Sequence, residues 1–162
     1  MPLRNRAEAD RDLDTGGSSS GGTSLGVSLS PQFTNGEPLT DDNFDAAIRA
    51  AIAWCYAQLP SSPAAGYNVV VPPGTWTLKA PLDFPGTYPK TTPGIVGAGN
   101  ESTYITVAFD STAGALTAGS DDLFAYQWHL EGFTLVTDNG VRVGNGIHIR
   151  TSYRCVLRDV TV

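Results

Sequence analysis

A short pattern of an apolar residue, a threonine and a second apolar residue recurs along this chain. It occurs at Trp76-Thr77-Leu78, Ile105-Thr106-Val107, Phe133-Thr134-Leu135 and Val160-Thr161-Val162, at spacings of 29, 28 and 27 residues. One such triplet is common in any β protein. Four at a nearly constant step predict a chain that returns to the same place once per coil. We therefore expect an all-β protein built from stacked coils.

The segments around these triplets read as strands. Apolar and polar residues alternate in short runs bracketed by Gly, Asn, Asp or Pro, at 68–71, 75–78, 104–109, 132–137, 146–150 and 157–162. The chain has 18 Gly and 11 Pro among 162 residues, and only 16% of its residues are charged. This composition favours turns and strands with a polar, uncharged outer face, and it disfavours a helical bundle.

The last two repeats align without a gap, residues 130–135 with 157–162. This register places Glu131 over Arg158 on neighbouring coils, a favourable pairing of charges. Extended to all four coils, it predicts two inward columns and an outward ladder of the four threonines. The first column is Trp76, Ile105, Phe133 and Val160, and the second is Leu78, Val107, Leu135 and Val162. A β-sandwich gives accidental threonine matches too and stays open as an alternative.

One segment has the periodicity of a helix rather than of a strand. In residues 42–59 the apolar side chains recur at steps of three or four and form one stripe: Phe44, Ile48, Ile52, Cys55 and Leu59. Asp42 is the expected N-cap, with Asp45 in a capping-box position. Pro60 and Pro63 end the helix.

Residues 1–38 read as an extended arm, and residues 39–162 as the folded domain. The arm carries charged residues and then the linker-like run TGGSSSGGTS. The formal charge is −6 and there is no Lys/Arg cluster, so nucleic acid is a poor partner. No run is apolar enough for membrane insertion, and the N-terminus lacks the apolar core of a signal peptide. We expect a soluble protein that is not exported.

Three motifs then occur in order along residues 40–162. They are the acidic helix start at 40–52, the strand and turn Val69-Val70-Val71-Pro72-Pro73-Gly74, and Ile95-Val96-Gly97-Ala98-Gly99-Asn100, followed by Asn145-Gly146-Ile147-His148-Ile149. In this combination they resemble the opening of a pectate-lyase-like right-handed β-helix. Polysaccharide lyases, glycoside hydrolases and bacteriophage tailspikes share that fold. The resemblance implies a right-handed parallel β-helix whose N-terminal end is capped by the one α-helix.

The resemblance to tailspikes suggests a function. It implies a bacteriophage virion structural protein of the tailspike or fibre type, a homotrimer that contacts other virion proteins through residues 1–38 and projects toward host-surface polysaccharide. The alternative is the front portion of a capsule or exopolysaccharide depolymerase with its active groove beyond residue 162. A carbohydrate-binding module is a weaker third hypothesis. The last matched strand ends without a polar capping coil, so we expect a longer protein or neighbouring subunits there.

The sequence assigns no catalytic, metal-binding or cofactor-binding residues. Glu131 and Asp159 fall on neighbouring coils, as a carboxylate pair would, but a surface ion pair with Arg158 is the simpler interpretation. Asp121-Asp122 and Asp138-Asn139-Gly140 read as turns. The remaining candidates are His129 and His148, which lack ligand spacing, the thiols of Cys55 and Cys155, and the aromatic residues Trp54, Tyr56, Tyr67, Tyr88, Tyr126, Trp128 and Tyr153. Exposed rings of this kind stack on sugars, but the sequence does not tell which are exposed. We expect two buried, reduced thiols, with a disulfide left open.

Overall fold

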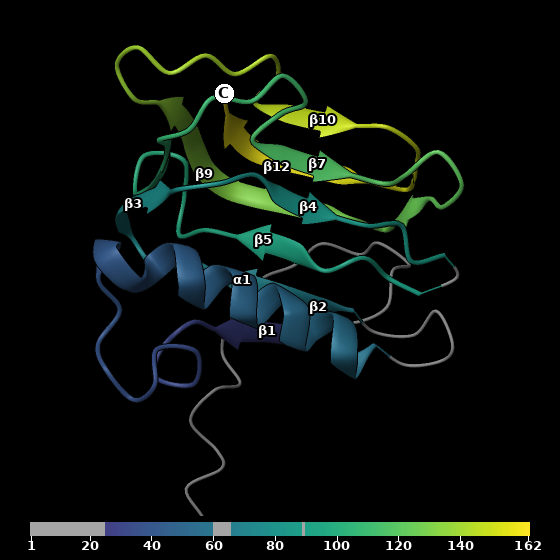
Figure 1. The fold of residues 1–162 in the computed structure, drawn as a ribbon. Coiled ribbons are helices and arrows are strands. Elements are labelled where there is room, and N and C mark those ends of the chain that lie inside the picture. The colour runs from purple at the N-terminus through teal and green to yellow at the C-terminus, as the bar shows by residue number, and fades with distance from the viewer. Residues whose placement is uncertain (1–24, 60–65, 89) are drawn as a thin grey trace, which may run out of the picture.

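The protein folds into a β-solenoid of about three turns (Figure 1). The computed structural model describes residues 25–59, 66–88 and 90–162. These residues form one helix, α1 (Asp41–Gln58), and the strands β1 (Leu25–Ser28), β2 (Tyr67–Val70), β3 (Gly74–Leu78), β4 (Leu82–Phe84), β5 (Gly94–Val96), β6 (Thr103–Val107), β7 (Leu116–Ala118), β8 (Ala125–Tyr126), β9 (His129–Thr137), β10 (Ile147–Ile149), β11 (Ser152–Tyr153) and β12 (Val156–Thr161).

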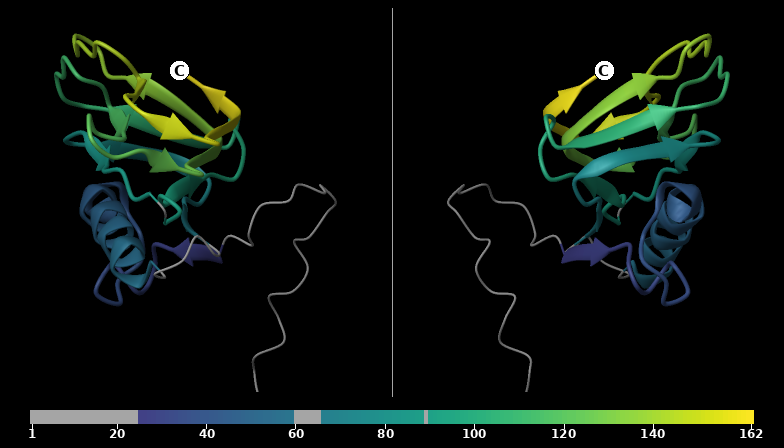
Figure 2. Two further views of the ribbon diagram at one scale, coloured as in Figure 1. Left: turned by 90° about the vertical axis from the view of Figure 1, so that its right-hand side faces the viewer. Right: turned by 90° about the vertical axis from the view of Figure 1, so that its left-hand side faces the viewer.

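Every strand pair between these elements is parallel, as stacked coils require. The largest sheet has the order β1-β2-β5-β9-β6-β3, with β12 added on β9. A second sheet, β10-β7-β4, and a pair, β11-β8, form the other sides of the coil. Figure 2 shows the strands of successive coils stacked in layers, with α1 and β1 at one end and the C-terminus at the other.

The predicted register of the last two coils is confirmed. Leu130 pairs with Leu157, Glu131 with Arg158, and Phe133 with Val160. The opposite charges also meet, because Arg158 Nη1 lies 3.6 Å from Glu131 Oε1. The step between the first two coils is confirmed as well, with Trp76 paired to Ile105 and Leu78 to Val107.

The predicted register between the second and third coils is wrong by two residues. Ile105 pairs with Leu135 rather than with Phe133, so Thr106 faces Val136 and the threonine ladder breaks into two pairs. Between β5 and β6, seven residues separate Val96 from Tyr104, whereas only two separate their partners on β9, Glu131 and Thr134. The second coil is longer here because the chain makes a turn at Gly97–Gly99 that β9 does not make. A constant step assumes coils of equal length. The two-residue shift keeps the same side chains inward.

The core runs along the inside of the solenoid. Phe133, Ile105, Leu130 and Trp128 are fully buried there, together with Leu78, Leu82, Phe84, Ile95 and Leu116. Like residues stack from coil to coil, for instance Leu82 on Leu116 and then Ile147 in the second sheet. The expected inward direction is confirmed for Leu78, Ile105, Val107, Phe133 and Leu135, which are buried, whereas Trp76 and Val160 are half-buried and Val162 is exposed.

Helix α1 begins one residue earlier than predicted and is capped differently. Thr40, not Asp42, is the N-cap, and its backbone N–H donates to Asn43 Oδ1 at 2.9 Å, so Asn43 fills the capping-box position expected for Asp45. The predicted stripe is confirmed at Phe44, Ile48, Ile52 and Cys55, which are buried. The fifth member, Leu59, is the C-cap and is only half-buried.

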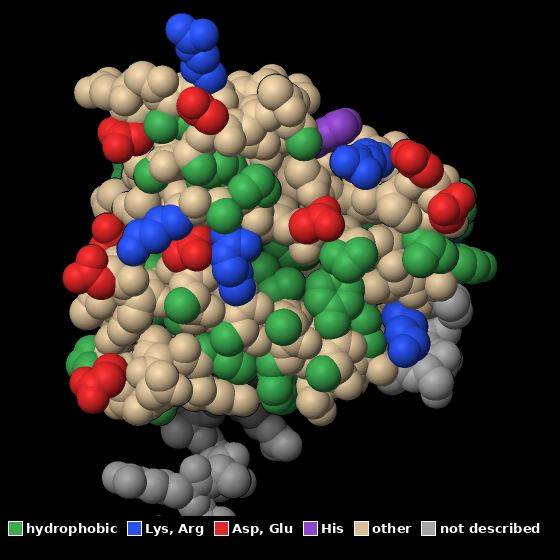
Figure 3. Space-filling view, viewed as in Figure 1, with side chains coloured by type: hydrophobic (Ala, Val, Ile, Leu, Met, Phe, Trp, Pro, Cys, Tyr) green, Lys and Arg blue, Asp and Glu red, His purple; other side chains and the backbone are tan. Residues whose placement is uncertain are grey.

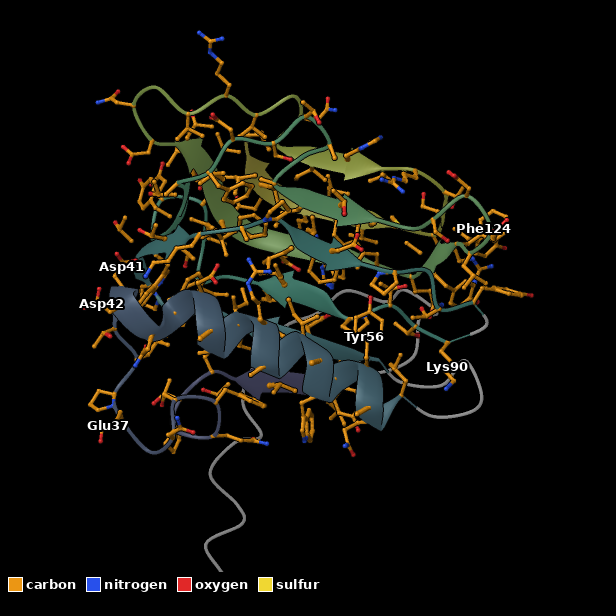
Figure 4. All side chains as sticks on the ribbon, viewed as in Figure 1. Glu37, Asp41, Asp42, Tyr56, Lys90 and Phe124 are labelled. Carbon is orange, nitrogen blue, oxygen red and sulfur yellow. The ribbon has the colours of Figure 1, made fainter. Side chains whose placement is uncertain are left out.

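Polar side chains of α1 dock on the free edge of β3. The backbone N–H and the hydroxyl of Thr77 both donate to Asp41, and the backbone N–H of Lys79 donates to Asp45 Oδ1 at 2.9 Å. Arg49 holds both carboxylate oxygens of Asp45 at 3.0 Å and donates to the carbonyls of Ala80 and Pro81. We call Asp41, Asp45 and Arg49 the helix latch. Figure 3 shows acidic and basic side chains side by side where α1 meets the strands, and Figure 4 places Asp41 at the first turn.

We expect Asp45→Asn to lower the free energy of unfolding by about 1–3 kcal/mol at neutral pH, the range for hydrogen bonds to a charged group. Burial raises the pKa of Asp45, but hydrogen bonds from Arg49 and Lys79 and their charges outweigh it, so that the pKa lies below 3.8. The carboxylate therefore stabilises the fold fully above pH of about 4, and this contribution is lost as the pH falls through the lower folded pKa.

Urea unfolding of both proteins across this pH range measures the effect. The difference between wild type and Asp45→Asn should narrow as the solution is acidified. Asp42→Asn is the matched control, because Asp42 is an exposed carboxylate of the same helical turn, and its loss should cost about 0.5 kcal/mol. Equal losses in the two variants would show that the helix dipole, not the latch, is responsible.

The described part of the expected arm belongs to the packed structure. Residues 1–24 lie outside the described residues. From Leu25 the chain forms β1, which pairs with β2 in register with Tyr67–Val70. Val27 and Leu29 are buried, so this part of the expected arm packs against the solenoid.

Both cysteines are free thiols, so no disulfide joins them. Cys55 lies on the buried face of α1, and this burial raises the pKa of its thiol to about 11. Cys155 is half-buried, with its Sγ 3.7 Å from the carbonyl oxygen of Ala125. The expectation of two reduced thiols is confirmed, although only Cys55 is fully buried.

Candidate functional site

Four aromatic rings converge on the side of the solenoid formed by β8 and β11. They line a pocket of about 500 Å³, which is within the range of small-ligand sites. We call this set the aromatic platform: Tyr88, Phe124, Tyr126 and Tyr153. Tyr88 is 58% exposed, Phe124 49% and Tyr153 50%. Figure 4 shows Phe124 at the edge of the molecule, with Lys90 near the same edge.

The geometry of the platform follows from strand pairing. Tyr126 of β8 lies in register with Tyr153 of β11 on the next coil, and their rings stack at 5.5 Å with an interplanar angle of 2°. Tyr88 closes one side edge-on, 5.5 Å from Tyr126 and 6.4 Å from Phe124. The result is a set of rings at fixed mutual angles, held by backbone hydrogen bonds of two coils.

A second column of polar side chains runs beside the rings. Gln127 and Arg154 each follow the platform tyrosine of their coil, and both have left-handed backbone angles, φ 52° and 57°. The Cζ of Arg154 lies 5.2 Å from the centre of the Tyr153 ring, within cation–π range. Gln127 Oε1 accepts a hydrogen bond from Thr91 at 3.0 Å, which leaves its amide N–H groups free to donate.

A charged cluster lies on the outer face of the largest sheet. His129 Nε2 is 2.8 Å from Glu131 Oε2, and its Nδ1 is 3.3 Å from the side-chain amide of Asn68. The amide nitrogen of Asn68 can only donate, so Nδ1 acts as the acceptor in this contact and Nε2 is the ring nitrogen that faces Glu131. Arg158 approaches Glu131 from the next coil, with 70% of its side chain exposed. The cluster therefore contains one carboxylate, one imidazole and one guanidinium.

The structure does not bring Glu131 and Asp159 together as a carboxylate pair. Asp159 has a φ of 51° and accepts a hydrogen bond from the backbone of Asn100 at 3.2 Å, whereas Glu131 faces His129 and Arg158. The interpretation as a surface ion pair is thereby confirmed.

The two acidic turns are confirmed as turns. Asp138-Asn139-Gly140 is closed by the hydrogen bond from Val141 N to Asp138 O, and Gly140 has a φ of 86°. Asp121-Asp122 lies between Ser120 and Leu123, whose backbone groups bond to each other.

His129 and His148 lie on different sheets. His148 belongs to β10 and pairs with Thr117, whose hydroxyl donates to Asp83. Within residues 25–59, 66–88 and 90–162, no group of three or more His, Cys, Asp or Glu side chains could hold a metal ion.

The other candidate aromatic residues pack against neighbouring elements and do not line the platform. Trp54 of α1 packs on Tyr67 of β2 at 5.5 Å, between the helix and the first coil. Tyr56 donates a hydrogen bond to the carbonyl of Pro85, and its burial, with the nearby charge of Asp83, raises its pKa well above the usual value. Trp128 is completely buried against Phe84.

A third surface is the apolar end of the core beyond the last described coil. Val162 is 69% exposed and Leu157 48%. A hollow of about 500 Å³ opens beside Val162, lined chiefly by apolar side chains of the last coils, among them Val107, Leu135 and Val143. Helix α1 contacts β2 and β3 of the first coil.

Comparisons of the chain with family models, with curated proteins and with solved structures found no match. The helix of the described part is not long and apolar enough to span a membrane. Three surfaces of the described residues are therefore the candidates for a functional site: the aromatic platform, the charged cluster and the apolar end.

Sequence reasoning considered three of the four platform rings but missed their convergence, and it missed Phe124 and Arg154. The sequence did contain a pattern that indicates the stacked tyrosine pair. The 27-residue step that aligns Phe133 with Val160 also aligns Tyr126 with Tyr153. Tyr88 and Phe124 could not be found in this way, because they lie in turns outside the repeat.

Proposed function

We propose that the chain is a virion structural protein of the bacteriophage tailspike or fibre type, located in the phage particle. The observation that carries this proposal is the β-solenoid of stacked parallel coils. A solenoid extends along one axis as coils are stacked, which is the shape that an elongated spike needs. The helix latch, which docks α1 beside β3, supports a closed base for such a spike.

In this proposal the solenoid is right-handed and α1 is its N-terminal cap. Right-handed crossovers predominate between parallel strands of one sheet, and β2–β5 and β5–β9 are parallel pairs of one sheet to which this rule applies. A solenoid needs its terminal coil covered to avoid open sheet edges. The latch supports the capping role of α1, because it gives partners to backbone groups of β3 that no strand pairs.

Residues 1–38 would attach the spike to other virion proteins, and three chains would form a homotrimer. The linker composition of 15–24 suits a tether, and β1 supplies a fixed point where the tether joins the solenoid. The solenoid would then project toward host-surface polysaccharide, where the aromatic platform is available for contact.

The second candidate is the front portion of a polysaccharide depolymerase. The charged cluster favours it, since an imidazole beside a carboxylate with a guanidinium nearby can move a proton next to a bound anion. Polysaccharide hydrolysis by the usual route needs a second carboxylate, which would come from outside this cluster. If residues of this chain take part, Glu131→Gln will abolish depolymerisation by the natural product, while Glu101→Gln, an exposed carboxylate elsewhere, will leave it unchanged.

The proposed function is tested on phage particles purified from the natural source. Antibodies against the solenoid should label surface projections in negative-stain electron microscopy, and peptides of this sequence should be found by mass spectrometry in the particle band. Recovery of the protein only from the particle-free fraction would contradict a virion role. Native mass spectrometry of the released protein should give three copies, and a monomer would contradict the homotrimer.

A further inference from the structure

The platform rings are exposed although buried positions lie next to them. Trp128 is two residues from Tyr126 and is completely buried, so the fold takes a large ring into its core at this point. Three large rings that are each about half exposed or more form one contiguous apolar surface on this side of the solenoid. Exposed apolar patches of this kind are characteristic of binding sites.

The rings of the platform are also arranged for binding before a ligand is present. Tyr126 and Tyr153 stand on paired strands of two coils, and Tyr88 meets Tyr126 edge-on, so these rings already pack on one another. Rings packed in this way lose less side-chain freedom on binding than isolated rings would. The hydroxyl groups of these three tyrosines make no hydrogen bond to another described residue, so they are free for hydroxyl groups of a ligand.

The polar column indicates the chemistry of the ligand. The Arg154 guanidinium lies against the Tyr153 ring, where it can form a charge-assisted, bidentate contact with a carboxylate on a ligand in the pocket. Gln127 adds amide donors on the neighbouring coil. The chain's formal charge of −6 is distributed over the whole sequence and is screened within about 8 Å at physiological salt, whereas Arg154 is at the site itself.

The geometry points to the aromatic platform as a binding site for a carboxylated pyranose of an acidic polysaccharide. The apolar C–H face of the sugar stacks on a platform ring, its hydroxyl groups bond to the tyrosine hydroxyls and Gln127, and its carboxylate pairs with Arg154. The biological role of this site rests on the proposed function, because it would be the contact between a spike and host polysaccharide. Binding by the purified chain does not depend on that role.

The test is binding of the full 162-residue chain to an array of bacterial capsular, exopolysaccharide and O-antigen polysaccharides, with polygalacturonate and dextran as acidic and neutral probes. We expect retention on acidic polysaccharides, weakening as salt is raised. Tyr153→Ala and Tyr88→Ala should each weaken binding at least tenfold. Arg154→Gln should weaken binding to acidic members only. Tyr104→Ala is the matched control, because Tyr104 is exposed on a different face.

The outcomes separate this inference from the proposed function. Failure to bind any array member overturns the inference, as does binding that Tyr153→Ala and Tyr88→Ala leave unchanged. If these variants instead convert an oligomer into monomers without any glycan binding, the platform is a subunit interface and the inference is also overturned. Labelled particles without glycan binding would leave the structural role standing, and glycan binding by a protein absent from particles would leave the site standing alone. Circular dichroism confirms that each variant is folded.

Discussion

Phe133→Ala is expected to lower the free energy of unfolding by about 3–5 kcal/mol. Phe133 is completely buried on β9 and pairs with Val160 of the next coil, so truncation leaves a cavity in the middle of the stack. The solenoid cannot close around it, because the strands on both sides are fixed by parallel hydrogen bonds. The midpoint of thermal unfolding should fall by roughly 10 °C.

Phe124→Ala provides the matched control for this prediction. It removes the same atoms from a ring that is 49% exposed, and its effect on stability should stay within about 0.5 kcal/mol. Urea unfolding followed by circular dichroism measures both variants. A cost below about 1 kcal/mol for Phe133→Ala would mean that the core is not packed around this ring.

Gly94→Ala should destabilise the protein by about 3 kcal/mol, at the upper end of the usual cost of overpacking. Gly94 lies in β5 between β2 and β9, and a Cβ there would be 2.1 Å from the carbonyl oxygen of His129 and 2.5 Å from Asn68 Oδ1. The His129 carbonyl is backbone of a paired strand and cannot move aside. The added methyl group must therefore push two strands apart.

Gly26→Ala is the control for this second prediction. Its nearest neighbour would be a side-chain methyl group of Val70 at 3.0 Å, which can yield. The same substitution should therefore change stability by less than about 1 kcal/mol when unfolding in urea is measured. If both variants lose equal stability, the cost would come from the loss of glycine itself and not from contact with β9.

The sequence was informative wherever one coil repeats the next without an insertion. The 27-residue step predicted the pairing of Glu131 with Arg158, and the helical stripe predicted the buried face of α1. It failed where a coil changes length, because the Gly97–Gly99 excursion shifts Ile105 onto Leu135 and nothing in the apolar pattern reports a shift of two. Short strands such as β4 and β7 were missed for a related reason, since three residues carry too little alternation to recognise.

The candidate site was less predictable than the fold. Trp128 is completely buried, whereas Tyr126 lines the platform, although both are aromatic and lie two residues apart. The left-handed backbone of Gln127, which lies between them, turns the two rings in different directions. The N-cap was misassigned for a similar reason. Thr40, Asp41 and Asp42 are all acceptable caps, and the structure uses Thr40 with Asn43 in the capping box, whereas Asp42 is an exposed residue of the first turn.

The helix latch pairs residues of a helix with residues of a strand, and the two elements advance by different distances along their axes. Four residues of a helix advance about 6.0 Å and two residues of a strand about 6.6 Å, so Asp41 and Asp45 meet Thr77 and Lys79 nearly in step. The mismatch of about 0.6 Å accumulates with each rung and soon exceeds the tolerance of a hydrogen bond. At the third rung the chain has Arg49, whose long side chain spans the accumulated offset to Pro81. Further turns of α1 would therefore add no hydrogen bonds of this kind, so a helix can cover the free edge of a short strand such as β3 but not of a long one.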